Sequence, residues 1–152
     1  MTPAIKRILL AEDSANDVEL TLAALGEHNL ANEVIVVRDG AEAWDYLTCQ
    51  GQFAGRAAGN PAVVLLDIKM PKVDGLEVLR RMRSDAELKS VPAVILTSSR
   101  EERDLLEGYK LGVNAYVVKP VDFREFIGAV KSLGLFWAVI NEPPPGSAQK
   151  AA

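Results

Sequence analysis

Four charged side chains of this sequence stand where short apolar runs end. They are Glu12, Asp13, Asp67 and Lys119, and the runs before them occupy residues 8–11, 63–66 and 115–118. A run that is apolar at every position is typical of a strand buried on both faces of a parallel sheet. Ligands of such sheets bind beyond the carboxyl ends of the strands. We therefore expect three acids and one lysine to converge on one edge of a sheet.

This combination of charges predicts a cation site and a nucleophile. Crowded carboxylates raise one another's pKa unless a cation compensates, and Mg²⁺ typically takes one or two protein carboxylates together with waters and phosphate oxygens. A carboxylate screened in this way can attack phosphorus, so Asp67 is the candidate for an aspartyl phosphate, with Lys119 stabilising the transferred charge. Thr97, just after the run at 93–96, is placed to meet a phosphate oxygen or, alternatively, to act as a turn or cap residue.

Each of these residues has a simpler explanation when it is taken alone. Glu12 and Asp13 can cap a helix, Asp67 can end a strand, and a lysine is usually solvated. Their shared position at predicted strand ends is what favours a site over coincidence.

The elements that must position these residues are predicted from periodicity. Strand-like and helix-like patterns alternate five times, which predicts an α/β fold with a doubly wound parallel sheet. The strands are expected at 7–11, 33–37, 63–66, 93–96 and 115–118. Apolar residues at helical spacing mark five helices: Val18, Leu22 and Leu25; Trp44 and Leu47; Leu76, Leu79 and Met82; Leu105 and Tyr109; and Phe123, Phe126, Ile127, Val130 and Leu133. Ser14 is predicted to cap the first helix, with Asp17 completing a capping box.

Length and composition indicate one soluble globular domain. The 152 residues are 49% hydrophobic and 25% charged, and we expect the domain at 1–140 with a flexible Pro-rich tail at 141–152. A net charge of −4 gives no reason to expect nucleic acid binding. No run approaches the ~20 apolar residues of a membrane span. A lone Cys49 and the absence of a signal-peptide pattern predict a cytoplasmic protein.

Residues 50–60 form a loop that is long for its place in such a fold.

Five ordered motifs extend the acid and lysine pattern. They are Glu12-Asp13, Asp67 with Met70-Pro71 and Asp74-Gly75, Thr97-Ser98, Tyr116, and Lys119-Pro120. Together they resemble the receiver domain of two-component response regulators over residues 5–137. The resemblance implies a flavodoxin-like (βα)₅ three-layer sandwich with parallel strand order 2-1-3-4-5.

The same resemblance implies a role for each motif residue. Asp67 would be the phosphoacceptor, Asp13 a direct Mg²⁺ ligand, and Glu12 an acid that acts mainly through metal-bound water. The backbone carbonyl of Lys69 would complete the metal ligands. Lys119 would pair with the phosphorylated Asp67, while Thr97 and Tyr116 would reorient together as a conformational switch. Such a protein is a phosphoacceptor that signals through its conformation, and it is not an enzyme acting on external substrates.

The long loop and the ending at 134–144 are similar to stand-alone receivers that serve phytochrome histidine kinases. This implies a sensor histidine kinase as partner and, with no output domain following, a response passed on through protein–protein contacts. Phe136 and Trp137 are adjacent, about 100° apart on a helix, so one helical stripe cannot bury both. We expect the pair to lie in a homodimer interface. The alternative is that residues 138–145 fold back over the two rings.

Two other functions are compatible with parts of the pattern. An aspartyl-phosphate phosphatase also uses a carboxylate at a strand end, but it has a second acid two residues later, where this sequence has Lys69. A non-phosphorylated interaction module would not need every position of the acid pocket to be filled. The single histidine, His28, is most simply a solvated residue.

Overall fold

The computed structural model describes residues 6–26, 32–57, 59–97, 110, 112, 115–119, 124, 125 and 128. Within these residues the elements are β1 (Lys6–Ala11), α1 (Ala15–Gly26), β2 (Asn32–Val37), α2 (Gly40–Leu47), the 3₁₀ turn η1 (Gly51–Phe53), β3 (Val63–Asp67), α3 (Gly75–Arg83), β4 (Ala93–Thr97) and β5 (Ala115–Val118). The apolar residues that mark the helices predicted around Leu105 and after Asp122 lie outside the described residues.

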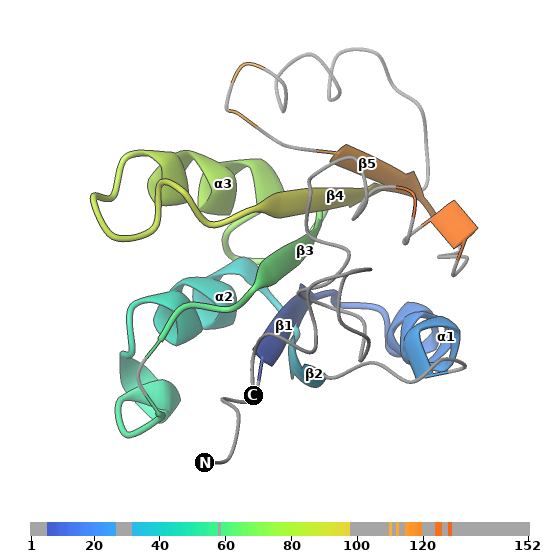
Figure 1. Ribbon diagram of the computed structural model, residues 1–152, viewed down its shortest axis with the longest axis horizontal. Coiled ribbons are helices and arrows are strands. Elements are labelled where there is room, and N and C mark those ends of the chain that lie inside the picture. The colour runs from blue at the N-terminus through green and yellow to red at the C-terminus, as the bar shows by residue number, and fades with distance from the viewer. Residues whose placement is uncertain are drawn as a thin grey trace, which may run out of the picture.

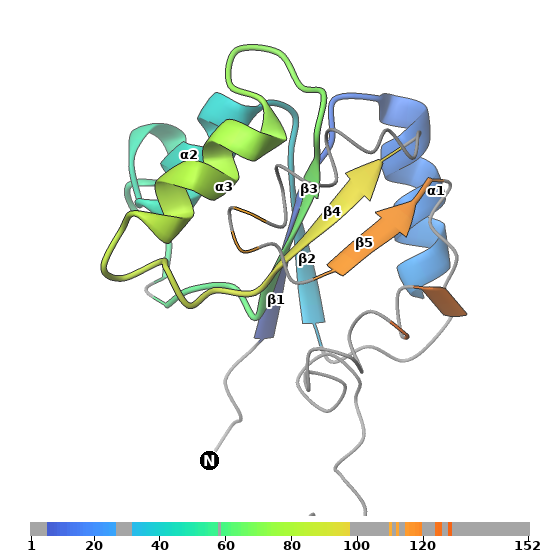
Figure 2. The ribbon, with the colours of Figure 1, turned by 90° about the horizontal axis from the view of Figure 1, so that it is seen from above.

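The strands form one parallel sheet in the order β2-β1-β3-β4-β5 (Figure 1). This confirms the predicted doubly wound topology, in which the chain runs outward from β1 in both directions. Helices α2 and α3 cover one face of the sheet, and α1 lies on the other face (Figure 2). The sheet is therefore covered on both sides, as the apolar runs of its central strands require.

The core follows from the two-residue period of a strand. Leu9, Ala11, Val64 and Leu66 belong to the hydrophobic cluster that also contains residues of α2 and α3. The intervening Leu10 and Leu65 point to the other face and are equally inaccessible to solvent, at 0% exposure. The central strands are thus buried on both sides up to their carboxyl ends.

Two of the helices begin at an aspartate that the sequence analysis did not identify as a cap. Asp39 precedes α2 and accepts a hydrogen bond from the Glu42 N–H at 2.8 Å, and Asp74 precedes α3 and accepts from the Glu77 N–H at 2.8 Å. Each aspartate therefore satisfies one of the unpaired N–H groups of a first helical turn.

In α1 the predicted buried face is partly wrong. Val18 is buried as expected, but Leu22 is 37% exposed and Thr21 is buried instead at 1%. The residue three positions after Val18, not the one four positions after it, faces the sheet.

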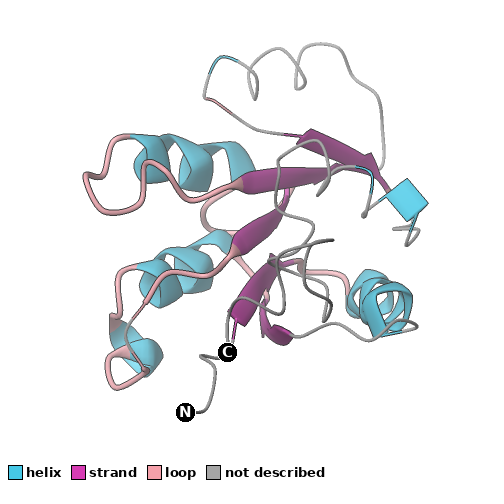
Figure 3. Ribbon diagram, viewed as in Figure 1, coloured by secondary structure: helices cyan, strands magenta, loops and turns pink. Residues whose placement is uncertain are grey.

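The predicted long loop at 50–60 begins with the 3₁₀ turn η1 (Figure 3) and is held by two arginines. Arg7 donates to the carbonyl oxygens of Ala57 and Gly59, and Arg56 donates to the carbonyl oxygen of Tyr46 at 2.7 Å while stacking over its ring at 4.2 Å. These contacts tie the loop to the start of β1 and the end of α2. Among the described helices, none is both long and apolar enough to cross a membrane.

Candidate functional site

The register of the sheet brings the predicted site residues to one edge. Ala11 pairs with Leu66, so the next residues, Glu12 and Asp67, stand side by side. Asp67 ends β3 opposite Leu96 of β4. Thr97 ends β4 opposite Val118 of β5, and Lys119 follows directly. Four separate positions in the sequence thus meet because parallel strands of similar length end at the same level.

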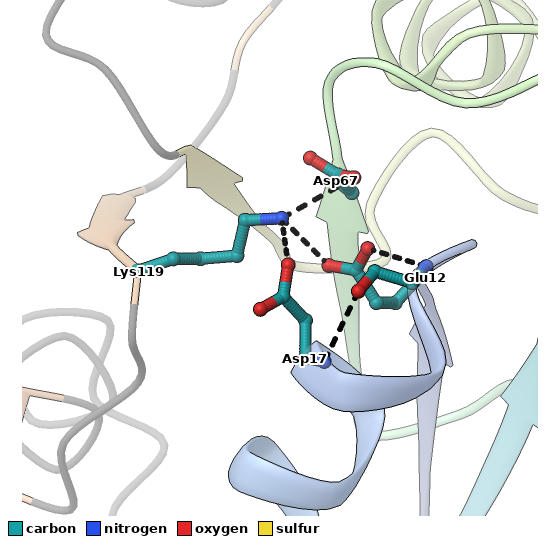
Figure 4. Close-up of polar contacts among 5 residues, drawn as sticks. Glu12, Asp17, Asp67 and Lys119 are labelled. Carbon is teal, nitrogen blue, oxygen red and sulfur yellow. Dashed lines mark hydrogen bonds and ion pairs between the residues drawn. The ribbon is translucent and has the colours of Figure 1, made fainter.

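Lys119 is the centre of a network of carboxylates (Figure 4). Its Nζ lies 2.9 Å from Glu12 Oε2, 2.9 Å from Asp17 Oδ2 and 3.4 Å from Asp67 Oδ2. The Lys119 side chain is 10% exposed and Glu12 is 0% exposed, so their ion pair is largely shielded from water, whereas the Asp17 side chain is 29% exposed. Shielding strengthens the attraction between opposite charges and makes any unpaired charge costly.

The second oxygen of Glu12 is also bound. Ser14 N–H donates to Glu12 Oε1 at 3.1 Å, and Ser14 Oγ accepts from the Asp17 N–H at 3.2 Å. The predicted cap by Ser14 is therefore confirmed. The structure differs from the predicted capping box because Asp17 Oδ2 receives Lys119, and the Ser14 N–H finds its acceptor in Glu12.

The protonation of the site reflects burial and crowding. Burial, followed by the charge of Glu12, raises the pKa of Asp67 from 3.8 to about 7, although Lys119 opposes the increase. Burial alone would lower the pKa of Lys119, but hydrogen bonds to Asp17 and Glu12 and the charges of Asp67 and Glu12 outweigh it and hold the pKa above its ordinary value. Lys119 is therefore a cation at neutral pH, whereas Asp67 is only partly ionised with these side chains alone around it.

Glu12, Asp13 and Asp67 can hold a divalent metal ion. One carboxylate oxygen from each lies within 4.8 Å of the others. Asp13 is exposed, whereas Glu12 and Asp67 are buried. With Asp17 and Lys119 included, four carboxylates and one ammonium carry a formal charge of −3 when all are ionised. Hard oxygen donors and a surplus of negative charge fit a small divalent cation.

The loop after Asp67 is shaped by glycines. A Cβ on Gly75 would lie 2.2 Å from the Asp67 carbonyl oxygen, so only glycine allows the start of α3 to approach the end of β3 this closely. The Gly75 N–H donates to the Ile68 carbonyl oxygen at 2.9 Å. On the neighbouring helix, a Cβ on Gly40 would lie 1.7 Å from the Val73 carbonyl oxygen. The loop that carries Lys69 is therefore packed against the beginnings of α2 and α3.

Of the remaining predicted residues, three lie within the described part of the chain and two lie outside it. Thr97 is the last residue of β4, at the same edge as Asp67. Tyr116 is half-buried and packs against the hydrophobic cluster, and Lys69 is exposed. Phe136 and Trp137 lie outside the described residues.

Asp17 is the member of the network that the sequence analysis did not identify as a site residue. It lies in a helix instead of at a strand end, and 102 residues separate it from Lys119. The sequence carried no local signal for this contact, because Asp17 lies in the first turn of α1 and its partner follows β5.

Known proteins share both the sequence pattern and the fold of this chain. The family model described as the response regulator receiver domain matches residues 8–131. Response regulator Rcp1 of Synechocystis sp. is 36% identical over 132 residues, which cover 87% of this chain and 88% of Rcp1. Its structure in a Mn²⁺-bound form matches with a TM-score of 0.72.

Two further solved structures are similar over nearly their whole length. The bacteriophytochrome response regulator RtBRR has 61% sequence identity and a TM-score of 0.83, and the match covers 96% of this chain and 88% of that one. The phosphorylated cyanobacterial phytochrome response regulator RcpA has 40% identity and a TM-score of 0.74, with 89% and 95% covered.

Proposed function

The chain belongs to the response regulator receiver domain family, and from this we propose that it accepts a phosphoryl group on Asp67 from a sensor histidine kinase of the phytochrome type. The phosphorylated protein then signals through a conformational change and contacts with other proteins in the cytoplasm. The observation that carries the proposal is the convergence of Glu12, Asp13, Asp67 and Lys119 at the carboxyl edge of the sheet.

The transfer itself needs an ionised Asp67. One carboxylate oxygen attacks phosphorus, the bond between phosphorus and the donor imidazole nitrogen breaks, and that nitrogen keeps the electron pair. Lys119 is placed to receive charge on the phosphoryl oxygens, because its Nζ lies 3.4 Å from Asp67 Oδ2. The protein contributes little further covalent chemistry, so the increase in rate comes from positioning of the reactants and from electrostatic stabilisation of the transferred group.

Mg²⁺ is the cofactor we assign to the acid cluster. Glu12, Asp13 and Asp67 would hold it, with the Lys69 backbone carbonyl as a further oxygen donor. When bound, it neutralises charge on the carboxylates and on the transferred group. Thr97 and Tyr116 are the proposed switch: Thr97 ends β4, the strand next to Asp67, and Tyr116 lies on β5, the strand paired with β4.

We regard the protein as a phosphoacceptor that assists its own phosphorylation and dephosphorylation. An aspartyl-phosphate phosphatase needs a general acid two residues after the nucleophile, and that position holds an exposed lysine, Lys69. The phytochrome partner is supported by the resemblance to RtBRR and RcpA, whose names carry that association.

The test of the phosphoacceptor is mass spectrometry after incubation with acetyl phosphate and Mg²⁺. We expect one hydroxylamine-labile phosphoryl group on the wild type, none on Asp67→Asn, and a strongly reduced rate in EDTA. Asp85→Asn serves as the control: it also removes a carboxylate, but from the loop after α3, where its Oδ1 accepts hydrogen bonds that an amide oxygen can also accept. Phosphorylation of Asp67→Asn at the wild-type rate, or a rate indifferent to EDTA, would contradict the assignment.

The partner is tested separately by phosphotransfer from purified histidine kinases, with a bacteriophytochrome kinase among them. We expect transfer from that kinase within seconds to minutes and much slower transfer from the others. Equal rates from all kinases would remove the phytochrome assignment and leave Asp67 as the acceptor.

A further inference from the structure

Lys119 is bound by an acid that lies outside the metal cluster. Asp17 belongs to the first turn of α1, and its Oδ2 lies as close to Lys119 Nζ, at 2.9 Å, as Glu12 Oε2 does. Asp67 is the more distant partner at 3.4 Å. Figure 4 shows Lys119 reaching from the end of β5 across the edge of the sheet, with Asp17 and Glu12 below its Nζ and Asp67 beyond it.

The two closer partners are both held in place. Glu12 directly follows β1, is fully buried, and its Oε1 accepts from the Ser14 N–H. Asp17 is fixed by the helix, and its N–H is bound by Ser14 Oγ. An ammonium group has three N–H donors on a flexible four-carbon stem. With two donors hydrogen-bonded to Glu12 and Asp17, the direction of the third is determined, and the nearest remaining acceptor is Asp67 Oδ2, which forms an ion pair with Nζ at 3.4 Å.

We propose that Asp17 is a positioning residue for phosphoryl transfer: together with Glu12 it orients Lys119 so that one N–H remains directed at Asp67 and at the phosphoryl group that Asp67 accepts. The inference rests on the proposed function. Phosphorylation places new oxygens on Asp67 itself, so Lys119 exchanges one acceptor on that residue for another. Neither Asp17 nor Glu12 has to release the ammonium for this exchange.

A different role for Asp17 predicts the opposite sign. A carboxylate near the site repels a dianionic phosphodonor and competes for Lys119, so its removal would accelerate phosphorylation. The positioning role predicts a slower reaction, because a lysine stem without its second anchor samples other rotamers. A role in stability alone predicts a lower melting temperature and an unchanged rate.

The experiment compares wild type, Asp17→Ala, Asp17→Asn and Glu19→Ala. Glu19 is an exposed acid on the same helix, so its variant controls for the loss of one negative charge. The rate of Asp67 phosphorylation is measured against acetyl phosphate concentration at saturating Mg²⁺, and melting temperatures are recorded in parallel. The ammonium resonance of Lys119, assigned by its absence in Lys119→Arg, is followed by ¹⁵N NMR.

We expect Asp17→Ala to lower the maximal rate about tenfold, the loss corresponding to one charge-assisted hydrogen bond. Asp17→Asn keeps an acceptor oxygen and should lose less, about threefold, while Glu19→Ala should match the wild type. The Lys119 ammonium resonance should broaden in Asp17→Ala through faster exchange with water. If Asp17→Ala does not fold, Asp17→Asn and the NMR signal carry the test.

The result that overturns the inference is an Asp17→Ala rate equal to or above those of wild type and Glu19→Ala. If wild type and Glu19→Ala themselves acquire no phosphoryl group on Asp67, the proposed function fails instead, so the two failures are distinguishable.

Discussion

The ionised Asp67 carboxylate should destabilise the metal-free protein, and its replacement by asparagine should therefore stabilise it. The side chain is 9% exposed, and burial together with the charge of Glu12 raises its pKa from 3.8 to about 7. Asparagine has nearly the same shape and no charge. Lys119 keeps its two contacts at 2.9 Å, to Glu12 and Asp17, when the Asp67 charge is removed.

The magnitude follows from the pKa. The difference between 3.8 and about 7 corresponds to about 4 kcal/mol, at roughly 1.4 kcal/mol for each pKa unit. Because the folded state binds this proton more tightly than the unfolded state, the wild type loses stability as the pH rises from about 4 to 7. The advantage of Asp67→Asn should be near zero at about pH 4, grow through this interval, and reach up to about 4 kcal/mol above pH 7.

Urea unfolding at several pH values between 4.5 and 8.5 in EDTA measures this advantage. Asp85→Asn is the matched control, and its stability should stay within about 0.5 kcal/mol of the wild type at each pH. Addition of Mg²⁺ should reduce the advantage of Asp67→Asn, because a bound cation stabilises the folded wild type. An Asp67→Asn protein that is no more stable than the wild type at pH 8 in EDTA would refute the reasoning.

Three further predictions concern other parts of the chain. Cys49 has a φ of 55° at the position after the α2 cap, where glycine is favoured. Cys49→Gly should therefore raise the free energy of unfolding by up to about 1 kcal/mol, whereas Cys49→Ala should not. Urea unfolding of both variants measures this difference. Lys69 is exposed beside the site, so Lys69→Ala should change the dephosphorylation rate while the melting temperature stays constant; an unchanged decay of the phosphoprotein would contradict this. We also propose a homodimer through Phe136 and Trp137: sedimentation velocity should show a dimer that the double change to serine dissociates, and a concentration-independent monomer of the wild type with and without phosphodonor would exclude it.

The fold was accessible from the sequence because strand and helix patterns alternate without ambiguity. The central strands contain apolar runs at 8–11, 63–66 and 93–96, and a polar residue, Glu12, Asp67 or Thr97, marks the carboxyl end of each run. The face of α1 was less predictable, since Thr21 is buried where Leu22 was expected. Positions three and four residues after Val18 both fit the spacing of one helical face, so spacing does not decide which of the two is buried. The packing against the sheet decides it.

The convergence of charged side chains at the sheet edge was predicted as far as it depends on strand ends. Glu12, Asp67 and Lys119 were found because parallel strands bring their carboxyl ends together. Asp17 was missed because a contact across 102 residues from a helix to a loop leaves no local pattern. The caps of α2 and α3 did leave one: Asp39 and Asp74 are each followed three positions later by a glutamate, the spacing of a capping box.

The glycine at the start of α2 shows that conserved charged motifs alone do not guarantee the same loop position in a relative of this protein. Gly40 lies 27 positions before Asp67 and carries no functional group, yet a single methyl group there would collide with the Val73 carbonyl oxygen in the loop beyond Asp67. A homologous chain could keep every acid and the lysine and still present a displaced loop. The position of the loop beyond Asp67 therefore depends on a hydrogen atom at position 40, which an inventory of charged residues would overlook.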